Sequence, residues 1–405
     1  MADPQSYMLM CFGQSNADVH DAGPRLAEEA ENSYPIFMPN DGKCVRGHMG
    51  RPRVTPITGF APISDAPSAV QSILAPAAAR ILHDMQTPPD RVIVRSEARG
   101  GRSFLGFERN GDVVDGIFRN PCGGHSIIFT NLITTMKDSI AAAHADGCPI
   151  TLINMVWLHG EADRAMARDA YSDLFLEFID TVETLMAPEG VALHWTLVQP
   201  SGTGPVGGGN FWPNRLSLFD VADERDNVDV GLAAYAYGQY DGAHYSADGK
   251  LRMGENLGRA IAKRLQEDVH IVPRPVGAQL VDDAVVLTFD VADDLILDTQ
   301  TNPLPDGTVL GFHTRDNNRA VLQAVRVVSD DQILLQFDQA PDPASLAIHY
   351  AYKHNRRSDA VTDVMCPAGR GCLRTAKAVP SCLREDAVLH DWAAAFSTRF
   401  DELAS

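Results

Sequence analysis

The feature that most constrains the fold is a short apolar run near the start of the chain, followed at once by a glycine and a serine. Tyr7–Phe12 is apolar and aromatic-rich, which predicts a buried strand. Gly13 allows a sharp turn and places Ser15 at the carboxyl end of that strand, where open α/β sheets bind their ligands. Most serines in such a position only cap the next helix. Ser15 therefore indicates a site only if other residues support it.

The stretch from residue 7 to 265 alternates strand-like and helix-like segments. Strands are expected at Arg91–Arg95, Ile150–Trp157, Val191–Val198 and Asn227–Leu232, and helices at Phe129–Ala145, Tyr171–Met186 and Ala247–Glu267. This alternation predicts a three-layer α/β/α sandwich with a parallel, flavodoxin-like sheet. Residues 17–65 and 202–213 are rich in turn-forming residues and are expected to be loops beside the site.

The pattern changes after Pro273-Arg274-Pro275, which we interpret as a linker. Short alternating runs separated by turn residues predict a small β-sandwich-like unit. These runs are Ala284–Phe289, Val309–His313, Ala320–Val328, Gln332–Phe337 and Ser345–Tyr352. The segment Arg384–Leu403 is expected to end the chain as a helix. The sequence therefore predicts two domains, a catalytic one at 1–270 and a small β-rich accessory one at 276–405.

Charge and hydropathy exclude several classes of partner. The chain has 405 residues and 53 Asp and Glu against 34 Lys and Arg, a net charge of −19. An acidic surface repels phosphate backbones, so we expect no nucleic acid partner. No run reaches the roughly 18 apolar residues of a membrane span, and no leader-like start is visible. The expected location is the cytoplasm, or outside the cell after removal of a leader or release with a phage virion.

Seven cysteines are present, and they do not suggest a metal site. A zinc site requires four ligands in paired spacings, and no fourth ligand is obvious beside the C-terminal cluster, so we expect no metal. That cluster is Cys366, Cys372 and Cys382. Free thiols are expected, with a local disulfide in the cluster as the alternative. The scattered cysteines are expected to be buried thiols: Cys11, Cys44, Cys122 and Cys148.

Asp241-Gly242-Ala243-His244 supplies what Ser15 lacks for nucleophilic catalysis. Serine is a weak nucleophile unless a base takes its proton. His244 is the candidate base, and Asp241 is close enough in sequence to reach its Nδ1–H and keep Nε2 facing Ser15. The alternative is a surface turn, since Asp-Gly is common in turns. Because both residues lie on one short loop, the sequence predicts a Ser15, Asp241 and His244 triad.

Four sequence blocks carry a family resemblance. They are, in order, Gly13-Gln14-Ser15-Asn16, Gly100-Gly101-Arg102-Ser103, Trp157-Leu158-His159-Gly160-Glu161-Ala162-Asp163 and Asp241-Gly242-Ala243-His244. They resemble the SGNH hydrolase superfamily, and within it the sialate O-acetylesterase and acetyl xylan esterase branch, whose blocks read GQSN, GG with Ser or Thr, WxQGEx with Asp or Asn, and DxxH. The resemblance spans about residues 7–265. The chain departs from it at His159, where the branch has glutamine, and at Arg102, which separates the glycines from Ser103.

This resemblance implies a serine esterase that removes O-acetyl groups from a carbohydrate through an acetyl-enzyme on Ser15. The implied substrate is an acetylated glycan or a small acetyl ester, with no cofactor. Two alternatives are a lipase- or thioesterase-type SGNH hydrolase, and a non-catalytic glycan-binding or structural protein with a vestigial hydrolase fold. The intact triad argues against the last, and the change at His159 argues slightly for it. The sequence identifies neither the sugar nor the oligomeric state.

Oxyanion donors must point to where negative charge develops. The backbone N–H of Ser15 is one, and a glycine of the Gly100-Gly101 pair is expected to provide the second. We favour Gly101, which stands in a Gly-x-Ser setting like the second block of the superfamily. The branch uses its glutamine side chain as a third donor. Here either the imidazole of His159 donates instead, or His159 is structural and the hole has two donors.

Three further residues are expected to support the site. Gln14 and Asn16 flank Ser15, and Asn16 is expected to fasten its turn by hydrogen bonds. Glu161 is expected to orient His159 or to bind the loop that carries Ser15; replacing Asp241 as the acid partner of His244 is a third alternative. Arg99 and Arg102 flank the second block, where they either meet an acidic sugar or remain solvated.

Overall fold

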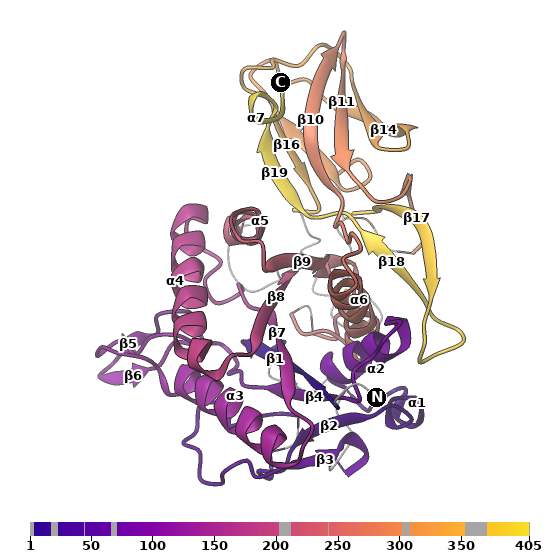
Figure 1. The fold of residues 1–405 in the computed structure, drawn as a ribbon. Coiled ribbons are helices and arrows are strands. Elements are labelled where there is room, and N and C mark those ends of the chain that lie inside the picture. The colour runs from indigo at the N-terminus through magenta and orange to yellow at the C-terminus, as the bar shows by residue number, and fades with distance from the viewer. Residues whose placement is uncertain are drawn as a thin grey trace.

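The fold is built around a seven-stranded sheet, shown with its flanking helices in Figure 1. The computed structural model describes residues 4–17, 23–43, 45–65, 71–201, 212–241, 243–301, 304, 308–352 and 371–404. Cys44, Cys366 and most of the loop expected at 202–213 lie outside these ranges. The strand order is β3-β2-β4-β1-β7-β8-β9. The bounds are β1 (Ser6–Gly13), β2 (Ile36–Pro39), β3 (Phe60–Pro62), β4 (Arg91–Ser96), β7 (Ile150–Leu158), β8 (Ala192–Gln199) and β9 (Val228–Ala233).

Strand β1 lies in the middle of this sheet, parallel to β4 on one side and β7 on the other. Its side chains alternate between two cores: Met8 and Phe12 face one, while Leu9 and Cys11 face the other. A strand buried on both faces reads as a continuous apolar run. The expected α/β architecture with a parallel sheet is confirmed, and only β3 runs antiparallel to its neighbour.

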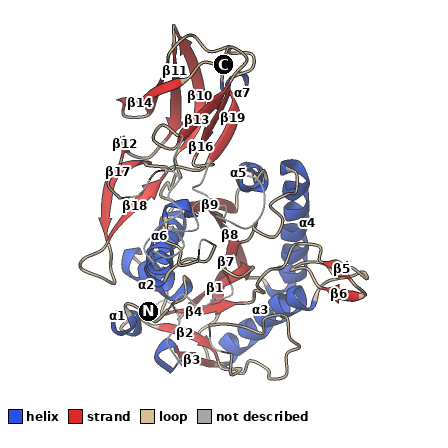
Figure 2. Ribbon diagram, turned by 180° about the vertical axis from the view of Figure 1, so that it is seen from behind, coloured by secondary structure: helices blue, strands red, loops and turns tan. Residues whose placement is uncertain are grey.

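Helices cover both faces of the sheet, as Figure 2 shows from behind. One face is covered by α3 (Ile127–Ala145), α4 (Arg168–Met186) and α5 (Asn214–Glu224), and the other by α2 (Leu74–Asp84) and α6 (Ala247–Leu265). The stretch 17–65, expected to be a loop, instead contains β2, β3 and α1 (Glu28–Asn32), so that expectation was wrong. The shorter elements are β5 (Phe107–Arg109), β6 (Asp112–Val114), and the 3-10 turns η1 (Ile63–Asp65), η2 (Ala187–Glu189) and η3 (Ala234–Ala236).

The C-terminal region is rich in antiparallel strands, as expected. One sheet has the order β10-β11-β15-β14, and two three-stranded sheets have the orders β12-β17-β18 and β13-β16-β19. The bounds are β10 (Arg274–Val281), β11 (Ala284–Asp290), β12 (Leu295–Leu297), β13 (Phe312–Arg315), β14 (Leu322–Ser329), β15 (Gln332–Phe337), β16 (Ala347–Tyr350), β17 (Leu373–Pro380), β18 (Val388–Trp392) and β19 (Phe396–Arg399). The division into two domains, residues 1–270 and residues 276–405, stays a prediction.

Two expectations for this region were wrong. The expected linker at Pro273–Pro275 includes the start of β10, where Arg274 pairs with Asp290 on an edge strand that tolerates proline. The expected helix at Arg384–Leu403 consists of β18, β19 and only one helical turn, α7 (Phe400–Leu403). The alanines between these strands are buried, and their backbone bonds to residues outside the segment. Tertiary contacts thus override the helical preference of alanine.

Three smaller features concern membrane spans, cysteines and metal ligands. No helix in the described ranges is long and apolar enough to cross a membrane. The described cysteines are free thiols, so no disulfide joins Cys372 to Cys382. Cys122 is exposed and Cys148 is half-buried, contrary to the expectation that both are buried, whereas Cys11 is buried as expected. No group of three or more His, Cys, Asp and Glu side chains in the described part of the chain is arranged to hold a metal ion.

Candidate active site

The turn that carries Ser15 is fastened to the end of β7. Gly13 has a φ of +146°, and a Cβ there would lie 2.0 Å from the carbonyl oxygen of Leu158. Only glycine therefore fits between β1 and β7 at this point. The backbone N–H of Gln14 donates to the Leu158 oxygen (3.2 Å), and its side-chain Oε1 accepts from Ala162 N (2.9 Å). Ser15 is left half-buried at the carboxyl end of β1.

Asp241 and His244 form a close pair. His244 Nδ1 lies 2.6 Å from Asp241 Oδ2, while Oδ1 accepts from the backbone N–H groups of His244 (2.6 Å) and Ala243 (2.9 Å). Burial raises the pKa of Asp241, but the hydrogen bonds from His244 and Ala243 outweigh it and hold the pKa below its usual value. A carboxylate can only accept, so Nδ1 carries the proton and Nε2 is the basic nitrogen.

Asn16 joins the turn of Ser15 to the loop of His244. Its Nδ2 donates to Ala243 O (3.1 Å) and to Glu161 Oε1 (2.9 Å), while its Oδ1 accepts from Tyr245 N (3.3 Å). Ala243 and Tyr245 are the residues on either side of His244. The residue after the candidate nucleophile is thus bonded to both neighbours of the candidate base, and the first and fourth blocks lie side by side.

Glu161 and Asp241 take different places in this arrangement. Of the three roles considered for Glu161, the geometry favours binding of the loop that carries Ser15, because its Oε1 accepts from Asn16. The carboxylate on His244 Nδ1 is that of Asp241. The other oxygen of Glu161, Oε2, is buried and has no hydrogen-bond partner among the described residues.

The second block lies against the first and the third. Arg99 N donates to Gly13 O (3.3 Å), and Asp163 Oδ2 accepts from Phe104 N (2.8 Å). Gly101 is exposed and has a φ of +67°. Within the described ranges, the N–H groups of Ser15, Gly100 and Gly101 donate to no protein acceptor. The main chain thus offers unused donors of the kind an oxyanion hole requires.

His159, the departure from the family pattern, is fully buried. Its Nε2 lies 2.9 Å from the carbonyl oxygen of Arg102, and its Nδ1 lies 2.9 Å from the hydroxyl of Tyr171. A carbonyl can only accept, so Nε2 carries the proton, and a neutral imidazole then has no second N–H. The geometry therefore favours the alternative in which His159 is structural, anchoring the second block, and the hole has two donors.

A buried ionic cluster lies beneath the second block. Glu97 directly follows β4; its Oε1 accepts from Arg95 Nε (3.0 Å) and Thr135 Oγ1 (3.0 Å) and lies 2.9 Å from His48 Nδ1. Arg95 also binds both oxygens of Asp41. Burial raises the pKa of Glu97, but the hydrogen bond from His48 and the charge of Arg95 outweigh it and bring the pKa down to about 2. The cluster fixes the segment that leads into Gly100 and Gly101.

Two residues of the site were assigned no role from the sequence. Asp163 accepts a hydrogen bond from Phe104 N, and its signal in the sequence was its place as the last residue of the third block. Tyr171, which holds His159, had no signal, because nothing in the sequence shows that α4 brings its hydroxyl to the end of β7. Arg99 and Arg102, which flank the second block, form no ion pair with any described residue.

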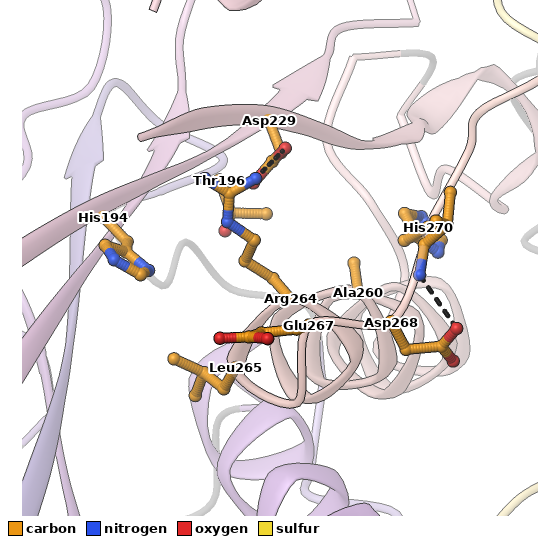
Figure 3. Close-up of a pocket in the computed structure, with 10 residues that line it drawn as sticks. His194, Thr196, Asp229, Ala260, Arg264, Leu265, Glu267, Asp268 and His270 are labelled. Atoms are coloured by element: carbon orange, nitrogen blue, oxygen red, sulfur yellow. Dashed lines mark hydrogen bonds and ion pairs between the residues drawn. The ribbon is translucent and has the colours of Figure 1, made fainter. Parts of the chain in front are cut away.

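A cavity of about 580 Å³ lies away from this site (Figure 3). It is lined by His194 and Asp229, which stand near the starts of β8 and β9, and by the last turn of α6. Arg264 Nη1 crosses it to Asp229 Oδ1 at 3.2 Å. It therefore opens at the amino-terminal edge of the parallel strands, opposite the edge that carries Ser15, and none of the expected site residues lines it.

Comparison with solved structures finds a protein that shares this fold. The structure of XAC1771, a carbohydrate acetylesterase from Xanthomonas citri, aligns with 97% of this chain and 80% of its own, at a TM-score of 0.58 and 14% identity. This chain has the fold of XAC1771. NanS aligns with 66% of the chain and 99% of its own (TM-score 0.43, 15% identity), and a family two carbohydrate esterase from Clostridium thermocellum with 65% and 66% (TM-score 0.31, 13% identity). No family model and no curated protein matches the sequence.

Proposed function

We propose that this chain is a serine esterase that removes O-acetyl groups from a carbohydrate. The observation that carries the proposal is the pair of hydrogen bonds by which Asn16 donates to Ala243 O and accepts from Tyr245 N. These bonds join the turn of Ser15 to both neighbours of His244, whose Nδ1 donates to Asp241. This is the arrangement of a nucleophile, a base and an orienting acid. The fold shared with a carbohydrate acetylesterase supports the choice of an acetylated sugar as substrate.

In the proposed reaction, Ser15 Oγ attacks the acetyl carbonyl while His244 Nε2 takes its proton. The N–H groups of Ser15 and Gly101, with Gly100 as the alternative to Gly101, receive the negative charge that develops on the carbonyl oxygen. The sugar oxygen then leaves with the proton from His244, and the acetyl group remains on Ser15. Water, deprotonated by His244, attacks this ester, and acetate leaves as Ser15 regains its proton.

The test is hydrolysis of p-nitrophenyl acetate and release of acetate from acetylated glycans by the purified protein. Ser15→Ala is expected to lower turnover by about 10⁴ to 10⁶ while the circular dichroism spectrum stays unchanged. If the variant keeps more than about a tenth of the wild-type rate, Ser15 is not the nucleophile. Faster hydrolysis of long-chain esters or thioesters points instead to the lipase or thioesterase alternative. Glycan binding without hydrolysis points to a vestigial site.

A further inference from the structure

The segment 234–246, called here the base loop, joins β9 to α6 and carries Asp241 and His244. Its second half is bonded within the α/β region, through Tyr245 to Asn16 and through Gln239 Nε2, which donates to Ser201 Oγ (2.8 Å). Its first half is bonded to the C-terminal strands, which Figure 1 shows beside the end of β9 and helix α6.

The first link is a pair of buried tyrosines. Tyr235, at the start of the base loop, places its hydroxyl 3.1 Å from that of Tyr350, the last residue of β16. The two rings meet edge to face, with centroids 6.1 Å apart, and both side chains are almost completely buried. The Tyr350 hydroxyl also accepts from Leu373 N (2.7 Å), at the first residue of β17. One hydroxyl thus ties the base loop to two C-terminal strands.

The second link runs through α6. Asn256 Nδ2 donates to the hydroxyl of Tyr237 in the base loop (2.6 Å) and to His390 O in β18 (3.2 Å). Arg259 holds Asn256 Oδ1 (2.8 Å) and both oxygens of Asp391, also in β18 (3.0 and 3.1 Å). Asn256 and Arg259 are buried, so the bonds of this link are shielded from water.

The third link lies under the second half of the base loop. Gln199, the last residue of β8, exchanges two hydrogen bonds with the backbone of Ala395, at 2.9 and 2.8 Å. Two residues further on, Ser201 accepts from Gln239 (2.8 Å) and donates its N–H to Tyr245 (3.3 Å). The backbone of Ala395 therefore holds the strand end on which the base loop rests.

The turn that carries Ser15 has other anchors than the base loop has. The bonds described above for Gln14 and Asn16 all run to the third block and the base loop. We propose that the C-terminal strands position the catalytic base, with Tyr350 as a positioning residue that acts on His244 through Tyr235. This inference rests on the proposed esterase function. Because a misplacement of about 1 Å can cost about 100-fold in rate, the consequence for turnover is measurable.

The test uses Tyr350→Phe, Tyr235→Phe and the double variant in the full-length protein, with p-nitrophenyl acetate as substrate. Each is expected to lower kcat about fivefold to tenfold with KM unchanged. The double variant is expected to match the single ones, because both remove the same link. In a His244→Ala background the same changes are expected to have no effect, since the position of an absent base does not matter. Wild-type kcat in Tyr350→Phe, or an equal loss in the His244→Ala background, would overturn the proposal.

Ser381→Ala is the matched control. It removes a hydrogen bond of 2.6 Å from the C-terminal region to Glu255 on α6, and the bonds that Ser381 Oγ accepts from Leu383 N (3.1 Å) and Arg384 N (2.9 Å), without touching the base loop. It is expected to lower thermal stability as Tyr350→Phe does, and to leave kcat unchanged; a kcat that falls equally in both variants would contradict the proposal.

A proton NMR measurement separates this proposal from that of esterase function. The Nδ1–H of His244, in its short bond to Asp241, is expected to give a downfield signal that shifts in Tyr350→Phe and stays in place in Ser381→Ala. If the wild-type protein hydrolyses no ester, the proposed function fails, and the shift still decides whether Tyr350 positions the base. An unchanged signal in Tyr350→Phe contradicts the positioning role.

Discussion

Replacing His159 by alanine distinguishes an oxyanion donor from an anchor of the second block. The change removes the bonds to Arg102 O and to the Tyr171 hydroxyl and opens a cavity beside Phe104, whose ring centroid lies 5.1 Å from that of His159. Truncation of a large buried side chain costs about 2–5 kcal/mol, and leaving a buried polar group unsatisfied costs about 1–3 kcal/mol. We therefore expect a loss of about 4 kcal/mol in the free energy of unfolding.

The assay combines thermal unfolding with steady-state hydrolysis of p-nitrophenyl acetate. With an unfolding entropy of about 2.1 cal/mol/K per residue over the whole chain, a loss of 4 kcal/mol corresponds to a fall of about 5 °C in Tm. As an anchor, His159→Ala is expected to cost less than about tenfold in kcat, through displacement of the second block. Tyr171→Phe, which removes only one bond of the anchor, is expected to lower Tm by about 1–2 °C and to leave kcat nearly unchanged.

A large loss of kcat without a loss of stability would refute the anchor role of His159. Loss of one oxyanion donor typically lowers kcat by about 10² to 10³. A fall of that size in a His159→Ala variant that unfolds at the wild-type temperature would show that the imidazole donates to the oxyanion. The tautomer deduced from the bond to Arg102 would then be wrong.

Three further predictions follow from the same contacts. Asp241→Asn is expected to lower kcat far more than Glu161→Gln, because Asp241 holds the tautomer of His244; the reverse ranking in the same assay would make Glu161 the acid. Glu97, with a pKa of about 2 against 4.5 for a free side chain, stabilises the fold above pH 4.5, and this contribution of about 3 kcal/mol is lost as the pH falls from 4.5 toward 2. Urea midpoints measured over that range are expected to fall steeply in the wild type and less in Glu97→Gln, and parallel curves would contradict this. A chain ending after Val272 is expected to be poorly soluble and inactive on p-nitrophenyl acetate, and a folded truncation with full activity would show that the C-terminal strands do not hold the base loop.

The central sheet and the four blocks could be predicted because their signals are local. Tyr7–Phe12 and Ile150–Trp157 are apolar runs of strand length, and glycines mark the turns that follow or precede site residues. Since the carboxyl ends of parallel strands lie at one edge of a sheet, the predicted strands before Ser15 and His159 place both residues at that edge. These inferences needed no knowledge of packing between distant segments.

The remaining features depend on contacts that no local pattern records. The alanines before β19 have a high helix propensity, but the backbone of the buried Ala395 is hydrogen-bonded to the side chain of Gln199, far away in the sequence. His159 occupies a donor position of the family pattern, yet its hydrogen-bonding capacity is used by Tyr171 and Arg102. The Tyr235 and Tyr350 pair joins residues more than a hundred positions apart, beyond the reach of any periodicity.

The central place of β1 in the sheet has a consequence for synthesis of the chain. Its two neighbours begin at Arg91 and Ile150, so the strand that leads to Ser15 leaves the ribosome long before either partner exists. The last anchor of the base loop, Ala395, follows about 20 to 80 s later at typical elongation rates of about 5–20 residues/s. During that interval an apolar strand without partners is exposed to aggregation and is a natural client for chaperones. We therefore expect the proposed ester hydrolysis only from the finished polypeptide, because a nascent chain that ends before Ala395 lacks an anchor of its base loop.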